Sequence, residues 1–272
     1  MLSSDSQLAV ATTTDSSLAL MRPVLFEVGG FEVKSYGVFV ALAFVAAWLV
    51  LRHELGRRAG RAEVAGALSM AAAVGGLVGA RAYWYLEHAG SASPGDAFSA
   101  AGFTWYGGVV GGALAVLAVA WRLRVRPADL FAAAAPALAL GYALGRIACQ
   151  FAGDGTYGRP SDLPWAMAYP HGEMPTTERV HPTPVYETVG GLMIFALLWR
   201  LRDRLSPRRL FAMYLLVSGG ERFVVEFIRR NDPVLAGLTQ PQLFAGALAG
   251  AGCLLLVWRT RPGLSGARLN AG

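Results

Sequence analysis

Seven apolar runs, each long enough or nearly long enough to cross a lipid bilayer, constrain the fold of this chain most strongly. They lie at about residues 36–51, 67–86, 104–120, 130–151, 185–199, 210–228 and 243–258. A bilayer core of about 30 Å needs about 20 helical residues, and backbone groups in lipid must be hydrogen-bonded internally. The sequence therefore predicts an all-α fold, an integral membrane bundle of about seven transmembrane helices.

The composition agrees with a membrane protein and argues against other classes. Only 15% of the residues are charged, against about a quarter in soluble domains, and the mean hydropathy is +0.43. Cys149 and Cys253 both lie in apolar stretches without the spacing of metal ligands. We therefore expect neither a disulfide framework nor a metal site.

The positive charges are distributed by side of the membrane. The connections after the first, third, fifth and seventh runs hold 15 of the 24 Lys and Arg residues, whereas the segments on the opposite side hold six. Cytoplasmic loops are enriched in these residues, so we expect the N-terminus outside, the C-terminus in the cytoplasm and no nucleic-acid partner. The other three, Arg81, Arg146 and Arg222, lie within apolar runs, where an unpaired charge is costly.

The ends of the chain differ from its centre. Residues 1–20 are rich in Ser, Thr and Ala, lack the regions of a signal peptide, and are predicted to be a disordered extension. A more coherent sequence begins at Met21, which leaves Met1 and Met21 as alternative starts. We predict one seven-helix membrane domain over residues 21–262 and a cytoplasmic tail over residues 263–272.

Arg146 begins a motif suited to an anionic ligand. It lies at the outer end of the fourth run and precedes a turn that contains Asp154 and Gly158. Glycine lets the backbone approach a ligand closely, and a guanidinium presents a planar fork of donors that suits phosphate. The structural alternative is that Arg146 pairs with Glu187 and fastens two helices together.

The motif HPTPVYE stands immediately before the fifth run and supplies His181, Tyr186 and Glu187. A hydrogen bond at the helix entry is the plain structural interpretation of His181, and an interfacial anchor that of Tyr186. Glu187 is harder to explain in this way, because a carboxylate that enters an apolar helix needs a partner.

A further motif, SGGERFVVEFIRRND, places charges within the sixth run. Arg222 and Glu226 are four residues apart and share one helix face, with Arg229 one turn further along and Glu221 beside Arg222. The structural alternative is an Arg222–Glu226 pair that neutralises itself.

Two other runs add polar positions near the same side of the membrane. Arg81 lies near the outer end of the second run, and Tyr106 precedes paired glycines at the start of the third, where Gly111 and Gly112 permit close helix packing. Charged positions from four runs thus concentrate in the outer half of the membrane. We expect a cationic pocket open to the headgroup region, with an anionic phospholipid as its ligand.

As an ordered set, these motifs resemble those of the prolipoprotein diacylglyceryl transferases, a bacterial family, over about residues 21–258. The likeness rests on LFEVGGFEVKSYG, GLVGAR, FTWYGGVVGG, GRIACQFAGDGTYG, DLPWAM, HPTPVYE and RFVVEFIR. It implies an inner-membrane enzyme whose site faces outward, with phosphatidylglycerol as donor, the lipobox cysteine of a prolipoprotein as acceptor, and no cofactor. The implied reaction forms a thioether at the glyceryl carbon and releases glycerol 1-phosphate.

The resemblance also implies roles for single residues. Arg146 and Arg222 match motif arginines and are expected to bind the phosphate and stabilise the leaving group. Other motif positions that support the pocket or lie near the donor lipid are matched by Glu226, His181, Tyr186, Glu187, Tyr36 and Arg81.

Some positions depart from the family's pattern. Tyr106 stands where many members have a histidine that is a proposed base, and a phenol with a pKa near 10 is a poor base. The usual asparagines after the motif arginine are absent, so Gln150 or Asp154 is the expected substitute. Ser218 stands where members often have a tyrosine.

These departures leave other functions open. The first alternative is a catalytically altered paralogue that binds anionic phospholipid or uses another acceptor. A small-molecule transporter is less favoured because the sequence shows no internal repeat. An intramembrane serine protease is less favoured still, because Ser218 lacks a histidine partner on a neighbouring run.

Overall fold

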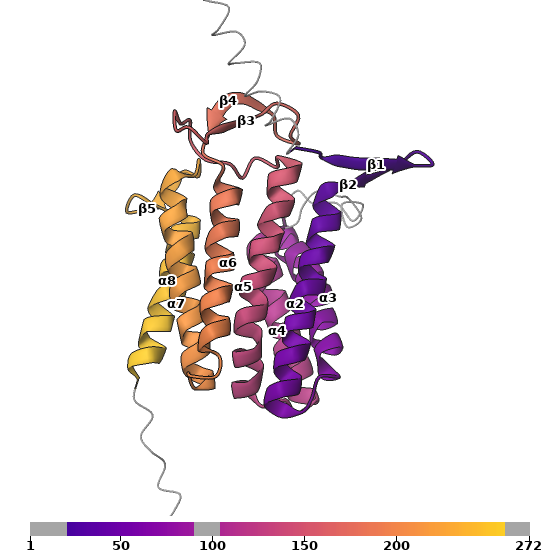
Figure 1. The fold of residues 1–272 in the computed structure, drawn as a ribbon, viewed down its shortest axis with the longest axis vertical. Helices are drawn as coiled ribbons and strands as arrows, with labels where there is room; N and C mark the ends of the chain where they lie inside the picture. The colour runs from indigo at the N-terminus through magenta and orange to yellow at the C-terminus, as the bar shows by residue number, and fades with distance from the viewer. Residues whose placement is uncertain (1–20, 90–103, 259–272) are drawn as a thin grey trace, which may run out of the picture.

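The computed structural model describes residues 21–89 and 104–258, which include seven long helices running side by side (Figure 1). They are α2 (Ser35–Ala59), α3 (Val64–Glu87), α4 (Trp105–Arg122), α5 (Pro127–Ala152), α6 (Thr183–Leu201), α7 (Pro207–Val225) and α8 (Gln240–Val257). Each predicted apolar run corresponds to one helix, and the sixth run ends in a short 3₁₀ helix, η2 (Glu226–Ile228). The predicted N-terminal extension and C-terminal tail lie outside the described residues.

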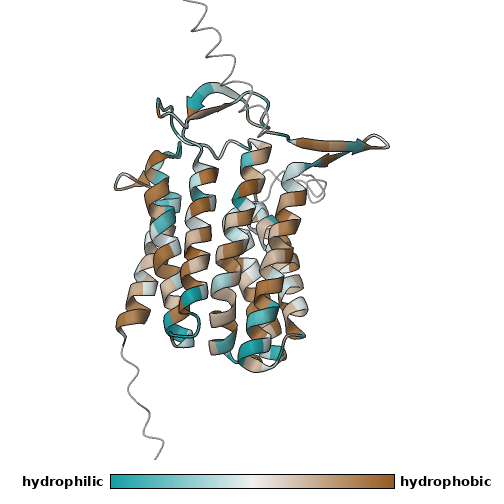
Figure 2. Ribbon diagram, in the orientation of Figure 1, coloured by the Kyte–Doolittle hydropathy of each residue, from teal (hydrophilic) through white to brown (hydrophobic). Residues whose placement is uncertain are grey.

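The helices have the lengths and surfaces of membrane helices. Five of them, α2, α3, α4, α5 and α8, are long and apolar enough to cross a membrane. Large apolar side chains such as Leu77, Val78 and Leu114 are exposed, and apolar residues recur along the length of the helices (Figure 2). An apolar exterior of this extent is typical of a surface covered by lipid. The chain is therefore a multi-pass helical membrane protein.

The all-α prediction omitted three small antiparallel hairpins among the described residues. These pair β1 (Val24–Val28) with β2 (Phe31–Lys34), β3 (Met167–Tyr169) with β4 (Thr176–Val180), and β5 (Pro233–Leu235) with β6 (Leu238–Thr239). Each hairpin has an irregular register, so the strands are too short and interrupted to give an alternating sequence pattern. The β3–β4 hairpin lies over one end of the bundle, which we call the cap end (Figure 1).

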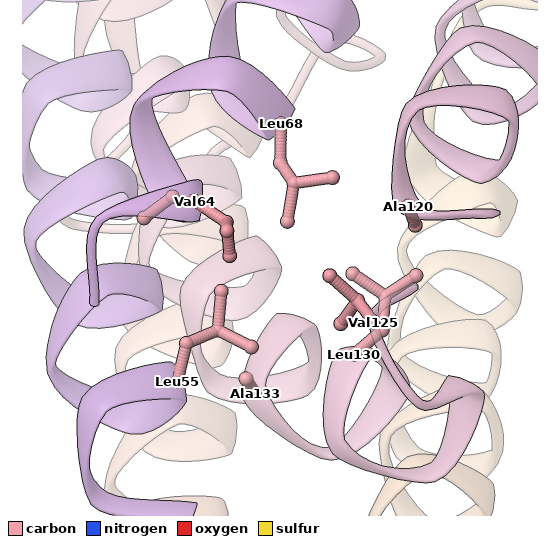
Figure 3. Packing of buried hydrophobic residues seen from close by; sticks show 8 residues of the cluster. Leu55, Val64, Leu68, Ala120, Val125, Leu130 and Ala133 are labelled. Carbon is pink, nitrogen blue, oxygen red and sulfur yellow. The ribbon is translucent and has the colours of Figure 1, made fainter. Parts of the chain in front are cut away.

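The opposite end of the bundle gathers the arginine-rich connections, in agreement with their predicted alternation. The connections α2–α3, α4–α5 and α6–α7 all lie at this arginine-rich end (Figure 1). Here the fully buried Glu54 lies 2.8 Å from Arg57, 3.0 Å from Arg58 and 3.3 Å from Arg202, and so links α2 to the α6–α7 connection. A nearby apolar cluster joins α2, α3, α4 and α5 (Figure 3); it consists of Leu55, Val64, Ala65, Leu68, Ala120, Val125, Leu130 and Ala133.

Facing glycines hold α3 and α4 together. A Cβ atom built on Gly79 would lie 2.7 Å from Gly111 Cα and still closer to Gly107 O. A Cβ atom on Gly75 would lie 2.8 Å from Gly111 O. Small residues let helices in lipid approach closely, so the predicted packing role of the glycines in the third run is confirmed.

Gly79→Ala should therefore destabilise the folded protein, because α3 and α4 must separate to admit one methyl group. We expect a loss of about 1–3 kcal/mol in unfolding free energy, seen as a lower midpoint of thermal unfolding in detergent. Gly66→Ala is the matched control, since a Cβ atom on Gly66 of the same helix meets nothing within 4 Å. Equal midpoints for the two variants would contradict this account of the interface.

Candidate functional site

A cavity of about 650 Å³ lies between the helices, toward the cap end of the bundle. Its polar lining includes Tyr106 from α4, Tyr142 and Arg146 from α5, Arg222 from α7, and Arg229 and Asn231 from the segment after η2. Its apolar lining includes Ala139, Ile194, Phe244 and Leu248. Five helices thus contribute to a single space that has a cationic part and an apolar part.

Glu187 is the carboxylate that joins the cationic residues. Its side chain is completely buried in the first turns of α6. Its Oε2 atom lies 3.1 Å from Arg229 Nη1 and 3.4 Å from Arg146 Nε, while its Oε1 atom lies 3.8 Å from Arg222 Nη1. Tyr142 also donates a hydrogen bond of 3.0 Å to Oε1. The predicted Arg146–Glu187 pair is present, and it is one contact of a larger cluster.

Glu226 is the second buried carboxylate of the cluster. Its Oε2 atom lies 2.6 Å from Arg222 Nη2 and 3.7 Å from Arg229 Nε. Its Oε1 atom accepts hydrogen bonds from Thr239 Oγ1 at 2.9 Å and from Asn231 Nδ2. The predicted Arg222–Glu226 pair is therefore present, and the carboxylate also fastens the start of α8 to the end of α7.

The salt-bridged groups carry more positive than negative charge. Three guanidinium groups, of Arg146, Arg222 and Arg229, share the carboxylates of Glu187 and Glu226, and all three arginines line the cavity. Arg222 Nη1 is buried and has no hydrogen-bond partner among the described residues. An excess of forked donors in a partly apolar space is suited to an anionic group such as phosphate.

Local sequence explains why these side chains meet. Pro182 and Pro184 set the start of α6, so that Glu187 enters the bundle in the second turn. Gly191, one turn later, lets α6 approach α5, since a Cβ atom there would lie 2.9 Å from that of Ala143. Arg222 and Glu226 are one turn apart across the end of α7, where the helix tightens into η2.

Two residues of the cluster were not assigned from the sequence. Tyr142 precedes Arg146 by four residues and so shares its helix face, a spacing that could have identified it. Arg229 follows Glu226 by three residues and was placed on the same face without a role. Its contact with Glu187 depends on how α6 packs, which no local spacing shows.

Gln150 lies near the end of α5, at the cap end of the bundle, and does not line the cavity. Its Oε1 atom accepts a hydrogen bond of 2.9 Å from Tyr169, and its Nε2 atom lies 3.2 Å from Met167 Sδ. Tyr169 is completely buried, and this burial raises the pKa of its phenol. The amide therefore attaches β3 to the end of α5 in the structure as it stands.

Asp154 and Gly158 shape the turn that follows α5. Asp154 Oδ1 accepts a hydrogen bond of 3.2 Å from the Thr156 amide, and Thr156 lines the cavity. Gly158 leaves no room for a side chain, because a Cβ atom there would lie 2.9 Å from His181 Cβ. These two residues thus position the cavity wall without lining it.

His181 and Tyr186 lie together where the cap meets α6. His181 Nδ1 is 3.4 Å from the Tyr186 hydroxyl, which accepts a hydrogen bond of 2.7 Å from Trp165 Nε1. Neither residue lines the cavity. The contact between them provides the hydrogen bond at the helix entry that the structural interpretation of His181 predicts.

The three remaining candidate residues lie in different environments; they are Tyr106, Tyr36 and Arg81. Tyr106 lines the cavity, and its ring packs edge-on against Phe244 of α8 with centroids 5.9 Å apart. Tyr36 lies in the first turn of α2 and outside the cavity lining. Arg81 also lies outside it, with its guanidinium carbon 5.7 Å from the centre of the Trp84 ring on α3.

Comparison with known proteins gives one consistent result. The family model described as prolipoprotein diacylglyceryl transferase matches residues 23–258. A phosphatidylglycerol–prolipoprotein diacylglyceryl transferase of Chromohalobacter salexigens is 34% identical over 263 residues, which is 92% of this chain and 96% of that protein. Proteins of the same name from Nostoc sp. and Clostridium tetani are 32% and 28% identical and cover 88% and 78% of the chain, and 91% and 87% of their own lengths.

Proposed function

Because this chain belongs to the prolipoprotein diacylglyceryl transferase family, we propose that it moves a diacylglyceryl group from phosphatidylglycerol to the lipobox cysteine of prolipoproteins. The single observation that supports this most directly is the group of three arginines on a cavity that also has an apolar wall. A phospholipid donor requires both surfaces, one for its phosphate and one for its glyceryl and upper acyl groups.

The reaction is a displacement at carbon. The thiolate sulfur of the acceptor attacks the glyceryl carbon that bears the phosphate, a C–S bond forms, and the C–O bond to the phosphate breaks. Glycerol 1-phosphate leaves with the electron pair. Since negative charge grows on the departing phosphate oxygen, preorganised donors at that oxygen lower the barrier.

We assign each arginine a role in this reaction from its position in the cavity. Arg146 and Arg222 bind the phosphate and stabilise the leaving group, and Arg229, held by both carboxylates, adds a third donor group. Glu187 and Glu226 keep the guanidinium groups in place before substrate binds. Tyr106 lines the same cavity and contacts the substrate. The surrounding structure at the cap end is supported by His181, Tyr186, Gln150, Asp154 and Gly158.

Tyr36 and Arg81 have a proposed role outside the cavity. Both lie outside the cavity lining, on α2 and α3, and we assign them to the surroundings of the donor lipid. Their aromatic and cationic groups are of the kinds that contact lipid headgroups.

The proposed enzyme lies in the bacterial inner membrane. All seven helices cross the bilayer as one domain over residues 21–262, the arginine-rich end faces the cytoplasm with the tail over residues 263–272, and the cap end faces outward. The three arginine-rich connections that lie together at one end of the described helices support this orientation. The cavity is then reached from the outer leaflet, where exported prolipoproteins arrive.

Labelling of single cysteines tests the orientation. In a variant without Cys149 and Cys253, we expect Glu178→Cys in β4 to react with a membrane-impermeant maleimide in spheroplasts. Arg204→Cys, in the exposed α6–α7 connection, should react only after the membrane is permeabilised. The reverse pattern would contradict the orientation and place the cavity on the cytoplasmic side.

Complementation tests the function in cells. A bacterium whose own diacylglyceryl transferase can be switched off should keep growing when it expresses this chain, and its lipoproteins should retain the diacylglyceryl mass. Growth arrest and accumulation of unmodified prolipoprotein, with the chain present in the membrane, would contradict the proposal.

A further inference from the structure

One carboxylate beside the cluster forms no salt bridge, although the guanidinium groups of Arg222 and Arg146 act on it from a greater distance. Glu221 on α7 forms no salt bridge with any described residue, whereas Glu187 and Glu226 are held by three and two arginines respectively. Glu221 Oε1 is buried and accepts no hydrogen bond from the described part of the chain. A carboxylate with one buried oxygen that accepts no hydrogen bond has spare capacity to take a proton.

Tyr142 connects Glu221 to the cavity. The tyrosine lines the cavity, and its hydroxyl lies 3.0 Å from Glu187 Oε1 and 3.4 Å from Glu221 Oε2. A phenol has one proton, which can be given to only one of the two carboxylates. Glu187 is already neutralised by its arginines, so Glu221 is the acceptor that gains most from this proton.

Glu221 lies behind the cavity wall and contacts the lining residue Tyr142. A Cβ atom on Gly190 of α6 would lie 3.0 Å from Glu221 Cγ and 3.1 Å from its Oε1, so the carboxyl group folds against a glycine surface. Glu221 itself does not line the cavity. The guanidinium of Arg146 lies over the Tyr142 ring, 4.9 Å from its centre, where it can stabilise negative charge on the phenol.

We propose that Tyr142 and Glu221 form the proton relay that activates the acceptor thiol in this chain. The proposal rests on the proposed function and supplies the base that the transfer needs, because a free thiol with a pKa of about 8.5 is mostly protonated at neutral pH. Tyr142 is then a catalytic residue, and Glu221 acts through it.

The relay conserves protons and electrons. The acceptor S–H gives its proton to the Tyr142 oxygen while the Tyr142 O–H gives its proton to Glu221 Oε2. The thiolate sulfur then forms the C–S bond, and the electron pair of the broken C–O bond leaves with glycerol phosphate. Return of the proton from Glu221 through Tyr142 to the phosphate oxygens or to water restores the starting state.

Tyr106 has no comparable acceptor. It lines the same cavity, and its ring packs against those of Trp105 and Phe244 with centroids 5.2 and 5.9 Å away. Arg222 and Glu226 act on it through their charges, but no described carboxylate forms a hydrogen bond with it. The charged groups that face the relay are Arg146 on α5, Glu187 on α6 and Arg222 on α7. All three remain in place when Glu221 alone is changed.

Glu221→Gln and Tyr142→Phe test the relay in the purified full chain, with phosphatidylglycerol vesicles and a lipobox peptide. Each variant should lower kcat for the cysteine peptide by about 100-fold or more with little change in KM for phosphatidylglycerol, the range expected for loss of a general base. The Glu221→Gln rate should rise tenfold per pH unit until the thiol ionises near pH 8.5. The matched control is Glu178→Gln, an exposed carboxylate on β4.

An acceptor peptide with selenocysteine in place of cysteine distinguishes loss of the relay from misfolding of the variants and from failure of the proposed function. A selenol is ionised at neutral pH and needs no base, so it should restore both variants to within a few-fold of the unmodified chain. Wild-type kcat and pH profile in Glu221→Gln and Tyr142→Phe would overturn the relay, as would selenol rates as low as the thiol rates. No transfer by the unmodified chain to either peptide would overturn the proposed function instead.

Discussion

Arg222→Ala is expected to lower diacylglyceryl transfer by about 1,000-fold or more, which in most assays is complete loss. Arg222 is the arginine that contacts Glu226 at 2.6 Å and Glu187 at 3.8 Å, and its buried Nη1 atom forms no hydrogen bond with a described residue. Removing a preorganised donor from a developing oxyanion costs about 100- to 1,000-fold, and an arginine that neutralises phosphate charge contributes more. Arg146→Ala should have an effect of similar size.

The measurement is release of glycerol phosphate in a single turnover, made on protein that elutes as a folded species in detergent. Arg222→Lys keeps the charge but loses the fork of donors, so its activity should remain well below that of the unmodified chain. Arg204→Ala removes the same charge from the exposed surface at the arginine-rich end and should leave transfer unchanged. Full transfer by Arg222→Ala or Arg146→Ala would contradict the role given to that residue.

Glu187→Ala is the second change with a large expected effect, and it should affect folding as well as transfer. The substitution leaves the guanidinium groups of Arg146 and Arg229 without their shared carboxylate in a buried site. Breaking a buried ion pair by removing one partner costs about 3–5 kcal/mol. We therefore expect a much lower midpoint of thermal unfolding in detergent, less folded protein in the membrane, and no transfer.

The control for this prediction is Glu178→Ala, which removes an exposed carboxylate that pairs with Arg230 across the cap. Exposed pairs contribute little, so its unfolding midpoint should stay close to that of the unmodified chain. An unchanged midpoint in Glu187→Ala would show that the arginines do not depend on Glu187, and the cluster would need another explanation.

The helices were predictable because their signal is local. Apolar runs of membrane-spanning length become helices wherever backbone groups cannot reach water, and the alternation of arginine-rich connections then determines which helix ends meet. The β3–β4 hairpin was not predicted, because three- and five-residue strands with an irregular register leave no periodic pattern. Its place over the bundle depends on contacts such as that between Tyr169 and Gln150.

Most residues of the site, but few of the contacts between them, could be predicted from the sequence. The Arg222–Glu226 pair follows from a spacing of four residues, and Arg146–Glu187 was one of two interpretations of a buried arginine. Sharing of Glu187 among three arginines required the packing of α5, α6 and α7, which residue spacing does not describe. The position of Glu221 could not be predicted for the same reason, because it lies against Gly190 of another helix.

Transfer by the purified chain tests the central claim most directly. The protein is mixed with phosphatidylglycerol and a peptide that contains a lipobox cysteine, and the peptide mass and the released glycerol phosphate are followed together. The account predicts a diacylglyceryl mass increase on the cysteine, with one glycerol phosphate released for each peptide modified. An unmodified peptide, under conditions in which a transferase of the same family modifies it fully, would contradict the account.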